Sequence, residues 1–457
     1  MWQHEISMVI LRLGLLPGHD GAKNGRYFLM GRVRISRGAG WVATAALPAM
    51  ASLILPLGYA EKKPVPPPFP EAKPAVSIEV DPLGYKPPGA FYLTYRLSSA
   101  ALGFFDDDHL LFTFRIGGLM KRAPADPLGD DDQEIRAVTL DLTTGKVAQQ
   151  ATWRMHDRSQ YLWPSRDGHF LVRMRDSLFI ADSTLQLQPL MTFKTAIRAM
   201  QVSPDRSLLV VETNDPAKLE NQPPDQKLLG GPPVRVMVFP LGEKTPILET
   251  QAKVPSLLPL LGDGLLDLLE GKAQKTWVMR DVPFEGEPRT VAEVKSNCQP
   301  SARPLSGSVV LMVGCASDSE SDDRQVIAVS TTGAGELWKD RWQNRFVWGW
   351  FDSAANGSRF LYESIQVNRQ ISQFDTLYPE DIQAQMAGVY DTETGKLVLV
   401  RDASPVLTAG QNAALSPDGK RFAILRNGVI EVYDLPPVSQ RESEKREMAA
   451  KKKAGGE

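Results

Sequence analysis

Short runs of apolar residues, each ended by a turn, alternate along most of this chain. The clearest unit lies near the C-terminus, where the runs 421–425 and 429–433 follow the turn Ser416-Pro417-Asp418-Gly419. Proline presets the backbone of this turn, while aspartate and glycine supply the side-chain bond and the permissive backbone that close it. The flanking runs are rich in residues that favour strands. The pattern predicts a strand, a tight turn, a strand, a short turn and another strand.

This unit recurs with drift seven times, with first turns near residues 108, 167, 205, 263, 307, 357 and 418. A second turn follows each first turn, and two second turns share the form Asp-x-x-Thr-Gly-Lys, starting at Asp141 and Asp391. Loop insertions at 121–134, 214–233 and 367–387 explain the unequal intervals. A small four-stranded sheet cannot bury both faces alone, so repeated units of this kind stack around a ring. We expect an all-β, seven-bladed β-propeller over residues 75–438.

The last repeat supplies only three clear strands, so closing the ring requires one more. Two strand-like runs precede the first repeat, at 75–80 and 91–98. We expect one of them to add the outer strand of the final blade and so to join the two ends of the propeller. The apolar runs 208–211, 309–313 and 422–425 are expected nearest the ring axis.

The turn Ser416 to Gly419 and the hairpin at Asp391 resemble the repeat of bacterial WD40-like and YVTN-type propellers. That group includes the quinoprotein amine dehydrogenase β-chain-like fold. The resemblance covers roughly residues 101–436 and implies a fold without an activity, because the shared residues form turns. The chain departs from WD40 repeats in lacking Gly-His and Trp-Asp pairs, and from YVTN repeats in lacking that tetrapeptide. Amine dehydrogenases carry their quinone on a small partner subunit, and no quinone-forming pattern occurs here, so we expect no cofactor.

Residues 1–60 read as a signal peptide region. Three arginines at 32, 34 and 37 precede the apolar segment 41–57, and a small-x-Ala sequence ends at Ala60, where we expect cleavage. Translation from Met30 would give a signal of conventional length. The alternative is an uncut single-pass anchor, although about 20 apolar residues are usual for that role. We expect export to the periplasm or the extracellular space, with a proline-rich spacer over 61–74 and a charged, disordered tail over 439–457.

The two cysteines, Cys298 and Cys315, both follow the signal region. An oxidising compartment would let them pair, and they flank a strand-like stretch, so a local disulfide is within reach. Two buried free thiols are the alternative. Their spacing matches neither a zinc site nor a redox Cys-x-x-Cys motif.

Composition narrows the function classes further. The net charge of -2 gives no general field for nucleic acid, and five histidines are few for a histidine-built metal site. Acidic loops at 106–108, 130–132 and 318–323 lack the full ligand spacing of a calcium loop, so solvated loop charge is the simpler interpretation and we predict no metal. No Gly-x-Ser-x-Gly elbow is present, and no catalytic residue is identified.

The densest aromatic cluster is the one candidate for a ligand site. Aromatic rings and arginines on a rim would grip a peptide or a sugar, while the simpler interpretation is packing between blades. The candidate ligand rim consists of Trp338, Arg341, Trp342, Arg345, Trp348 and Trp350. We therefore expect an exported binding or scaffolding module for a protein, peptide or glycan. The alternative is a propeller enzyme of the quinoprotein dehydrogenase or lyase/hydrolase type, which would place convergent titratable groups in its central channel.

Overall fold

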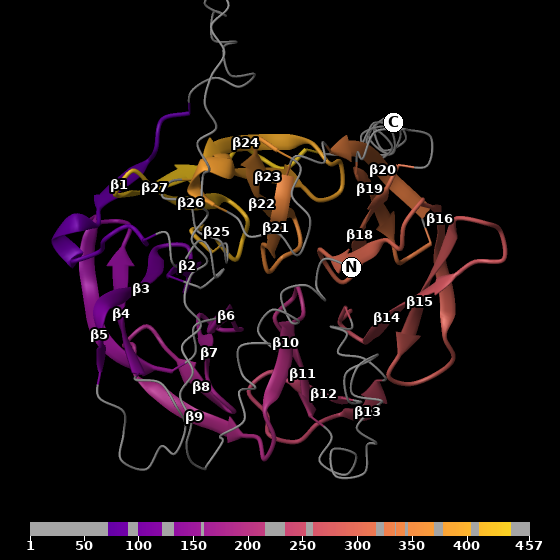
Figure 1. The fold of residues 1–457 in the computed structure, drawn as a ribbon, viewed down its shortest axis with the longest axis horizontal. Helices are drawn as coiled ribbons and strands as arrows, with labels where there is room; N and C mark the ends of the chain where they lie inside the picture. The colour runs from indigo at the N-terminus through magenta and orange to yellow at the C-terminus, as the bar shows by residue number, and fades with distance from the viewer. Residues whose placement is uncertain are drawn as a thin grey trace, which may run out of the picture.

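The computed structural model of this chain describes residues 72–89, 99–120, 132–156, 160–214, 234–252, 259–316, 324–333, 335–342, 346–369, 378–403 and 411–439. In these ranges the strands form seven antiparallel sheets arranged around one axis (Figure 1). Each sheet is a blade, numbered here 1 to 7 in the chain order of the innermost strands. The chain is thus the seven-bladed β-propeller that its repeats predict. The same ranges hold no helix with the length and apolar character needed to cross a membrane.

Six blades contribute an innermost strand that lies beside the axis. These strands are β2 (Ala100–Phe104), β6 (Leu162–Pro164), β10 (Ile197–Val202), β17 (Ser301–Pro304), β21 (Phe346–Ser353) and β25 (Ala413–Leu415). In blade 4 a single antiparallel bridge between Leu260 and Leu265 takes this place within the described residues. Each innermost strand runs into one of the seven first turns, so these turns all lie at one end of the ring, called here the turn end.

The second strands lie inside the blades, next to the innermost strands. They are β3 (His109–Met120), β7 (Phe170–Met174), β11 (Leu208–Asn214), β14 (Gly264–Glu270), β18 (Val309–Cys315), β22 (Arg359–Val367) and β26 (Arg421–Arg426). The apolar runs 208–211, 309–313 and 422–425 belong to β11, β18 and β26, so their predicted place nearest the axis was wrong. A second strand is covered by neighbouring blades on both faces and reads as a continuous apolar run, whereas an innermost strand has one side on the channel.

The third and outer strands complete the blades. The third strands are β4 (Asp132–Asp141), β8 (Ser177–Ala181), β12 (Val234–Pro240), β15 (Thr276–Pro283), β19 (Arg324–Ser330), β23 (Ile382–Asp391) and β27 (Val429–Asp434). The outer strands are β5 (Lys146–Met155), β9 (Leu187–Thr192), β13 (Leu248–Ala252), β16 (Arg289–Lys295), β20 (Gly335–Trp342), β24 (Leu397–Asp402) and β1 (Val76–Glu79). The second turns join third to outer strands in blades 1 to 6, and in blade 7 the chain leaves the sheet after β27.

The N-terminal strand closes the ring. β1 pairs antiparallel with β27, with Val76 opposite Val432 and Glu79 opposite Val429. Blade 7 therefore combines three C-terminal strands with one N-terminal strand, as predicted for the run 75–80. The other candidate run, 91–98, lies outside the described residues. Ile78 and Val80 are buried in the apolar cluster between blades 7 and 1, so packing as well as pairing holds the closing strand.

In blades 3 and 7 a serine hydroxyl shapes the first turn. In blade 7, Ser416 Oγ donates to Asp418 Oδ1 at 2.7 Å and accepts from the backbone N–H groups of Lys420 and Arg421 at 3.1 and 2.9 Å. In blade 3, Ser203 Oγ makes the same bond to Asp205 Oδ1 at 2.6 Å. The first turns of blades 3 and 7 therefore share a hydrogen-bond pattern as well as a sequence.

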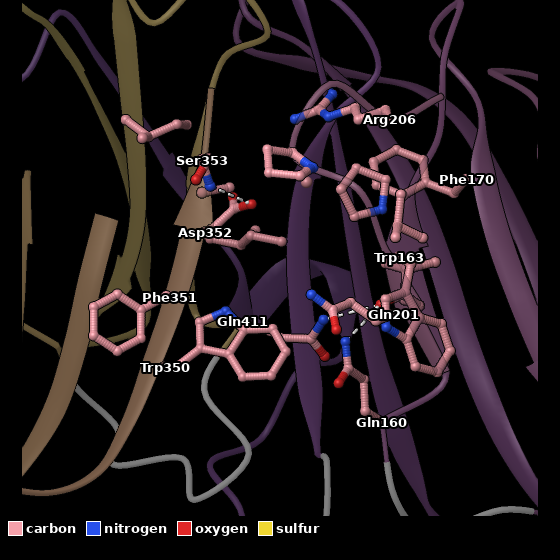
Figure 2. Close-up of a pocket in the computed structure, with 18 of the residues that line it drawn as sticks. Gln160, Trp163, Phe170, Gln201, Arg206, Trp350, Phe351, Asp352, Ser353 and Gln411 are labelled. Carbon is pink, nitrogen blue, oxygen red and sulfur yellow. Dashed lines mark hydrogen bonds between the residues drawn. The ribbon is translucent and has the colours of Figure 1, made fainter. Parts of the chain in front are cut away.

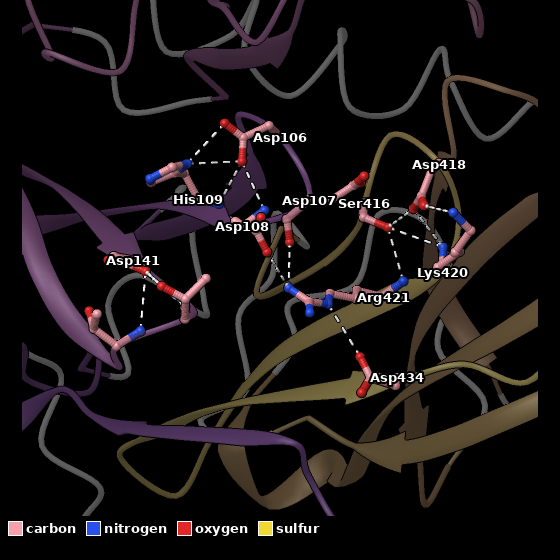
Figure 3. Close-up of polar contacts among 12 residues, drawn as sticks. Asp106, Asp107, Asp108, His109, Asp141, Ser416, Asp418, Lys420, Arg421 and Asp434 are labelled. Carbon is pink, nitrogen blue, oxygen red and sulfur yellow. Dashed lines mark hydrogen bonds and ion pairs between the residues drawn. The ribbon is translucent and has the colours of Figure 1, made fainter.

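Polar contacts also fasten the seam between blades 7 and 1 (Figure 3). Arg421 Nη1 donates to the backbone oxygen of Asp107 at 2.7 Å and pairs with Asp108 Oδ1 at 3.0 Å. Its Nε pairs with Asp434 Oδ1 at 3.2 Å. Burial and the neighbouring Asp418 carboxyl raise the pKa of the Asp107 carboxyl, while the charges of Lys420 and Arg421 act in the opposite direction. The acidic loop at 106–108 thus faces arginine and lysine side chains at the turn end.

Candidate functional site

A cavity of about 240 Å³ lies in the central channel, between the innermost strands of blades 1, 2, 3, 5, 6 and 7. Aromatic rings form much of its wall: Phe104, Trp163, Phe170, Trp350 and Phe351. Figure 2 shows several of them converging from opposite sides of the channel. A β-carbon at Gly103 would lie 2.5 Å from the Phe170 ring, so glycine at this position lets that ring reach the wall. Three charged side chains complete the lining, Arg206, Arg303 and Asp352.

Arg206 lies at the turn end of the channel in an unusual backbone conformation. Its φ is +60°, in the left-handed region that favours glycine. The matching position in blade 7 is Gly419, with φ +71°. Arg206 is 6% exposed, and among the described residues no carboxylate lies within ion-pair distance of it. Burial lowers the pKa of its guanidinium, and the charge of Asp352 partly offsets that effect.

Asp352 is the last residue but one of β21, the innermost strand of blade 6, and faces the same part of the cavity (Figure 2). Its Oδ1 accepts a hydrogen bond from the backbone N–H of Ser353 at 2.9 Å. Enclosure by the surrounding blades raises the pKa of this carboxyl, while the charge of Arg206 and the backbone N–H groups of Ser353 and Leu415 act in the opposite direction. Arg206 and Asp352 therefore influence each other across the channel without a direct salt bridge.

Arg303 is the second guanidinium of the cavity. Its Cζ lies 5.4 Å from the centroid of the Phe351 ring, which the cation covers. Its Nε is buried with no hydrogen-bond partner in the described part of the chain, and no carboxylate there pairs with it. Burial lowers the pKa of Arg303 to about 10. A desolvated cation without a counter-ion is costly, so its place beside a cavity is the feature that most needs an explanation.

Amide side chains gather at the other end of the cavity. Gln160 Nε2 and Gln411 Nε2 both donate to the backbone oxygen of Leu162, at 3.2 and 3.0 Å (Figure 2). The Oε1 atoms of Gln201 and Gln411 are buried and receive no hydrogen bond from the described residues. Gln411 comes from blade 7 and Leu162 from blade 2, so this contact crosses the channel.

Glu363 stands behind Gln411 and outside the cavity lining. It is 1% exposed, and its Oε2 accepts a hydrogen bond from the backbone N–H of Gln411 at 3.1 Å. Burial raises the pKa of Glu363 to about 8; the hydrogen bond from Gln411 opposes this shift and the charge of Asp352 adds to it. The carboxyl is therefore mostly protonated at neutral pH, and the described channel walls carry more positive than negative charge.

The candidate ligand rim is divided between two places. Trp338 and Trp342 lie on β20 and pack against blade 6, where Trp338 Nε1 donates to Thr392 O at 2.8 Å and Trp342 stacks on Tyr362 at 4.4 Å. Trp350 instead lines the central cavity. The remaining members follow: Arg341 is exposed on β20, Trp348 belongs to β21, and Arg345 lies outside the described residues.

Cysteines and acidic residues were the other candidates. The structure joins Cys298, between β16 and β17, to Cys315 at the end of β18, in a disulfide with a Cα–Cα distance of 5.5 Å. Within the described ranges no group of three or more His, Cys, Asp or Glu side chains is arranged to hold a metal ion. The acidic run at 318–323 lies outside those ranges.

Sequence reasoning did not single out Arg206, Arg303, Asp352 or Glu363. One signal was available for the first of them: the turn at 203–206 reads Ser-Pro-Asp-Arg where the turn at 416–419 reads Ser-Pro-Asp-Gly. A bulky residue at the position where the repeat has glycine strains the turn, and such strain often marks a functional site. The other three stand on strands whose facing cannot be read without the register.

The chain matches no protein family model and no curated protein. Among solved structures it is similar to putative TolB from Agrobacterium tumefaciens, at 14% identity and TM-score 0.39, covering 68% of this chain and 100% of that one. It is similar to the acylaminoacyl peptidase of Pyrococcus horikoshii, at 11% identity and TM-score 0.46, covering 80% of this chain and 55% of that one. The C-terminal WD40 domain of Sif2 matches at 11% identity and TM-score 0.35, with coverage of 80% and 99%. Similarities at this level concern the fold alone.

Proposed function

We propose that this chain is an exported binding module that holds its ligand in the central channel. The observation that carries the proposal is Arg303, a desolvated guanidinium that lines the cavity and has no counter-ion among the described residues. Buried charges in folded proteins are normally paired, so an unpaired one beside a cavity indicates a partner supplied from outside the chain. A protein, peptide or glycan is the broad class of ligand that we propose.

The channel is a better candidate than the predicted rim. The rings of Trp338 and Trp342 stack on Phe360 and Tyr362 of blade 6, so they are covered by the protein itself. The Trp338 ring also packs closely on Gly395, where a β-carbon would lie 2.5 Å from it. Trp163 and Trp350 instead face open space in the cavity. Aromatic rings that remain partly exposed inside a concave site are the usual wall of a ligand pocket.

Fluorine NMR of protein labelled with 5-fluorotryptophan tests this location. The chain has nine tryptophans, whose signals are assigned by single Trp→Phe variants. Three probe sets are titrated: small carboxylates, neutral sugars and primary amines. Saturable shifts of the Trp163 or Trp350 signals support channel binding, with Trp338 and Trp342 as internal references. Shifts confined to Trp338 and Trp342 would move the site to the rim, and no shift with any set would overturn the proposal.

Export is supported by the basic-apolar-small pattern before Ala60 and by the disulfide, which is stable in oxidising compartments. Cell fractionation followed by N-terminal sequencing tests it. We expect mature protein that begins at Glu61 in the periplasm or medium. Protein found in the membrane with residues 41–57 still attached would support the uncut anchor instead.

A second candidate function is catalysis at the channel. Two carboxyl groups with raised pKa values, Asp352 and Glu363, lie near the cavity, and such groups are used as general acids. Turnover of chromogenic nitrophenyl esters and glycosides would favour an enzyme if Asp352→Asn abolished it and left the fold intact. Ligand binding that persists in Asp352→Asn, without turnover in the parent, would favour the binding module.

A further inference from the structure

The charges around the cavity are unbalanced. Two guanidinium groups and one carboxyl line it, and no described carboxylate forms a salt bridge with either arginine. Glu363 behind the wall does not restore the balance when it is protonated. Field lines in a narrow channel with low-dielectric walls are concentrated, so an excess positive charge attracts anions into it.

The rest of the wall is apolar. Phe351 lies under the Arg303 guanidinium, and Trp350 precedes it on the same strand. Trp163 faces the cavity from blade 2, whereas Phe104 and Phe170 behind it are only 3% and 1% exposed. A small inorganic anion would pair with arginine but leave the half-buried Trp163 and Trp350 rings uncovered, whereas an apolar body attached to the anion would cover them and gain the free energy of burial.

We propose that the channel ligand is an apolar or aromatic group that bears a carboxylate, with the carboxylate on Arg303 and the body against the Trp350 and Trp163 rings. This inference rests on the proposed function, because it names the chemistry of the ligand in the same cavity. Guanidinium and carboxylate form planar, two-point hydrogen bonds, which would give the Arg303 cation the counter-charge that the described residues do not supply. Arg206 contributes attraction from the turn end of the channel without having to touch the ligand.

Other ligand classes fit the cavity less well. An amine would meet two cations, and like charges at close range in a low-dielectric site repel strongly. A neutral sugar would cover the aromatic rings but leave the Arg303 cation without a counter-charge. Free organic acids and the C-terminus of a polypeptide both carry a carboxylate. The channel wall would recognise this carboxylate and the apolar group beside it in either source.

Isothermal titration calorimetry with matched probes tests the inference. The first pair is 3-phenylpropionate and its neutral amide, and the second is an acetylated tripeptide ending in phenylalanine with a free or an amidated C-terminus. We expect each acid to bind about tenfold or more tightly than its amide, because only the acid is charged. A free acid that binds while the tripeptide acid does not would identify small acids as the source, and the reverse would identify chain ends.

Variants at Arg303 test whether its guanidinium binds the ligand carboxylate. We expect Arg303→Met to lower affinity for the acids by about tenfold to a hundredfold and to leave affinity for the amides unchanged, and Arg303→Lys to restore part of the loss. Arg289→Met is the matched control, since Arg289 is an exposed arginine on β16 paired with Asp281. Circular dichroism confirms that each variant is folded.

Two outcomes separate this inference from the proposed function. Neutral sugars or amides that shift the Trp350 fluorine signal as strongly as the acids would overturn the carboxylate assignment and leave channel binding in place. Acids that bind equally to the parent and to Arg303→Met, without moving the Trp163 or Trp350 signals, would overturn both.

Discussion

Arginine at position 206 occupies a backbone conformation that residues with side chains rarely adopt. The turn of blade 7 uses glycine at the same step, with nearly the same φ, while Ser203 and Ser416 make equivalent hydrogen bonds in the two turns. Left-handed backbone at a non-glycine residue costs on the order of 1 kcal/mol. Asp167 in the first turn of blade 2 shares this conformation, but Arg206 adds a buried guanidinium that lines the cavity, which is typical of a functional position.

Replacing Arg206 with glycine separates a role in ligand binding from a role in stability. We expect Arg206→Gly to keep the free energy of unfolding within about 1 kcal/mol of the parent, because relief of backbone strain offsets the extra freedom of the unfolded chain. Affinity for 3-phenylpropionate is expected to fall, by less than in Arg303→Met. Urea denaturation and calorimetry measure the two effects. A structural salt bridge to Asp352 would instead show as a loss of about 3–5 kcal/mol.

Glu363 makes stability depend on pH. Its pKa rises from 4.5 to about 8 on folding, so between these values the folded chain holds a proton that the unfolded chain has released. Stability contributed by this group is therefore present below about pH 4.5 and is lost as the pH rises toward 8. We expect Glu363→Gln to gain stability relative to the parent across this window, with a slope approaching about 1.4 kcal/mol per pH unit. Denaturation curves from pH 5 to 8 measure it, and a constant difference would contradict the shift.

At the scale of elements, the packing of the closing strand β1 can be tested directly. Ile78 on β1 is buried against blade 1, while its neighbour Ser77 points to solvent. We expect Ile78→Ala to lower the free energy of unfolding by about 2–4 kcal/mol, because it leaves a cavity between blades 7 and 1. Ser77→Ala, on the other face of the same strand, should change it by less than about 0.5 kcal/mol. Equal effects in chemical denaturation would mean that backbone pairing alone holds β1.

The disulfide makes its own prediction. Cys298 and Cys315 are 17 residues apart, and a loop of that length loses conformational entropy equivalent to about 3 kcal/mol in the unfolded chain. We expect a thiol reductant to lower the stability of the parent by about this amount. The double variant with serine at both positions should unfold at the lower value with or without reductant. A parent that is indifferent to reductant would show that the bond does not restrain the unfolded chain.

Elements that owe their shape to local bonds could be predicted from sequence. The seven first turns were found because residues such as Ser416 and Asp418 form their hydrogen bonds within five positions. The identity of the innermost strands could not be found in this way, since second strands are the more apolar ones. Arg303 and Asp352 line one cavity only because blades 5 and 6 stand side by side around an axis, and no spacing along the chain encodes that arrangement.

At the scale of the whole molecule, the first and last strands of the propeller meet in one blade. The backbone N–H of Ala75 donates to Val432 O at 2.8 Å, so the two termini of the propeller run beside each other. This arrangement predicts that the place of closure is interchangeable. A circular permutant that links residue 439 to residue 72 and opens at 334, in the turn between β19 and β20, would close blade 5 with an N-terminal outer strand in the same way.

We expect that permutant to fold and to keep the channel ligand site. Far-UV circular dichroism and titration with 3-phenylpropionate measure the two properties. A permutant opened between β17 and β18 is the comparison, because it divides the channel wall next to Arg303. Failure of the first permutant with success of the second would show that closure at blade 7 is a specific requirement of this fold.

β1 is synthesised before every other strand of the ring, yet its partner β27 is synthesised last. The first strand must therefore wait, with both backbone edges unpaired, while six complete blades are made. The time that the rest of the chain takes to reach the folding compartment sets the length of that wait. Folding of this molecule ends where its synthesis began, and any protein that shields β1 during the delay would govern how much of the chain reaches its native state.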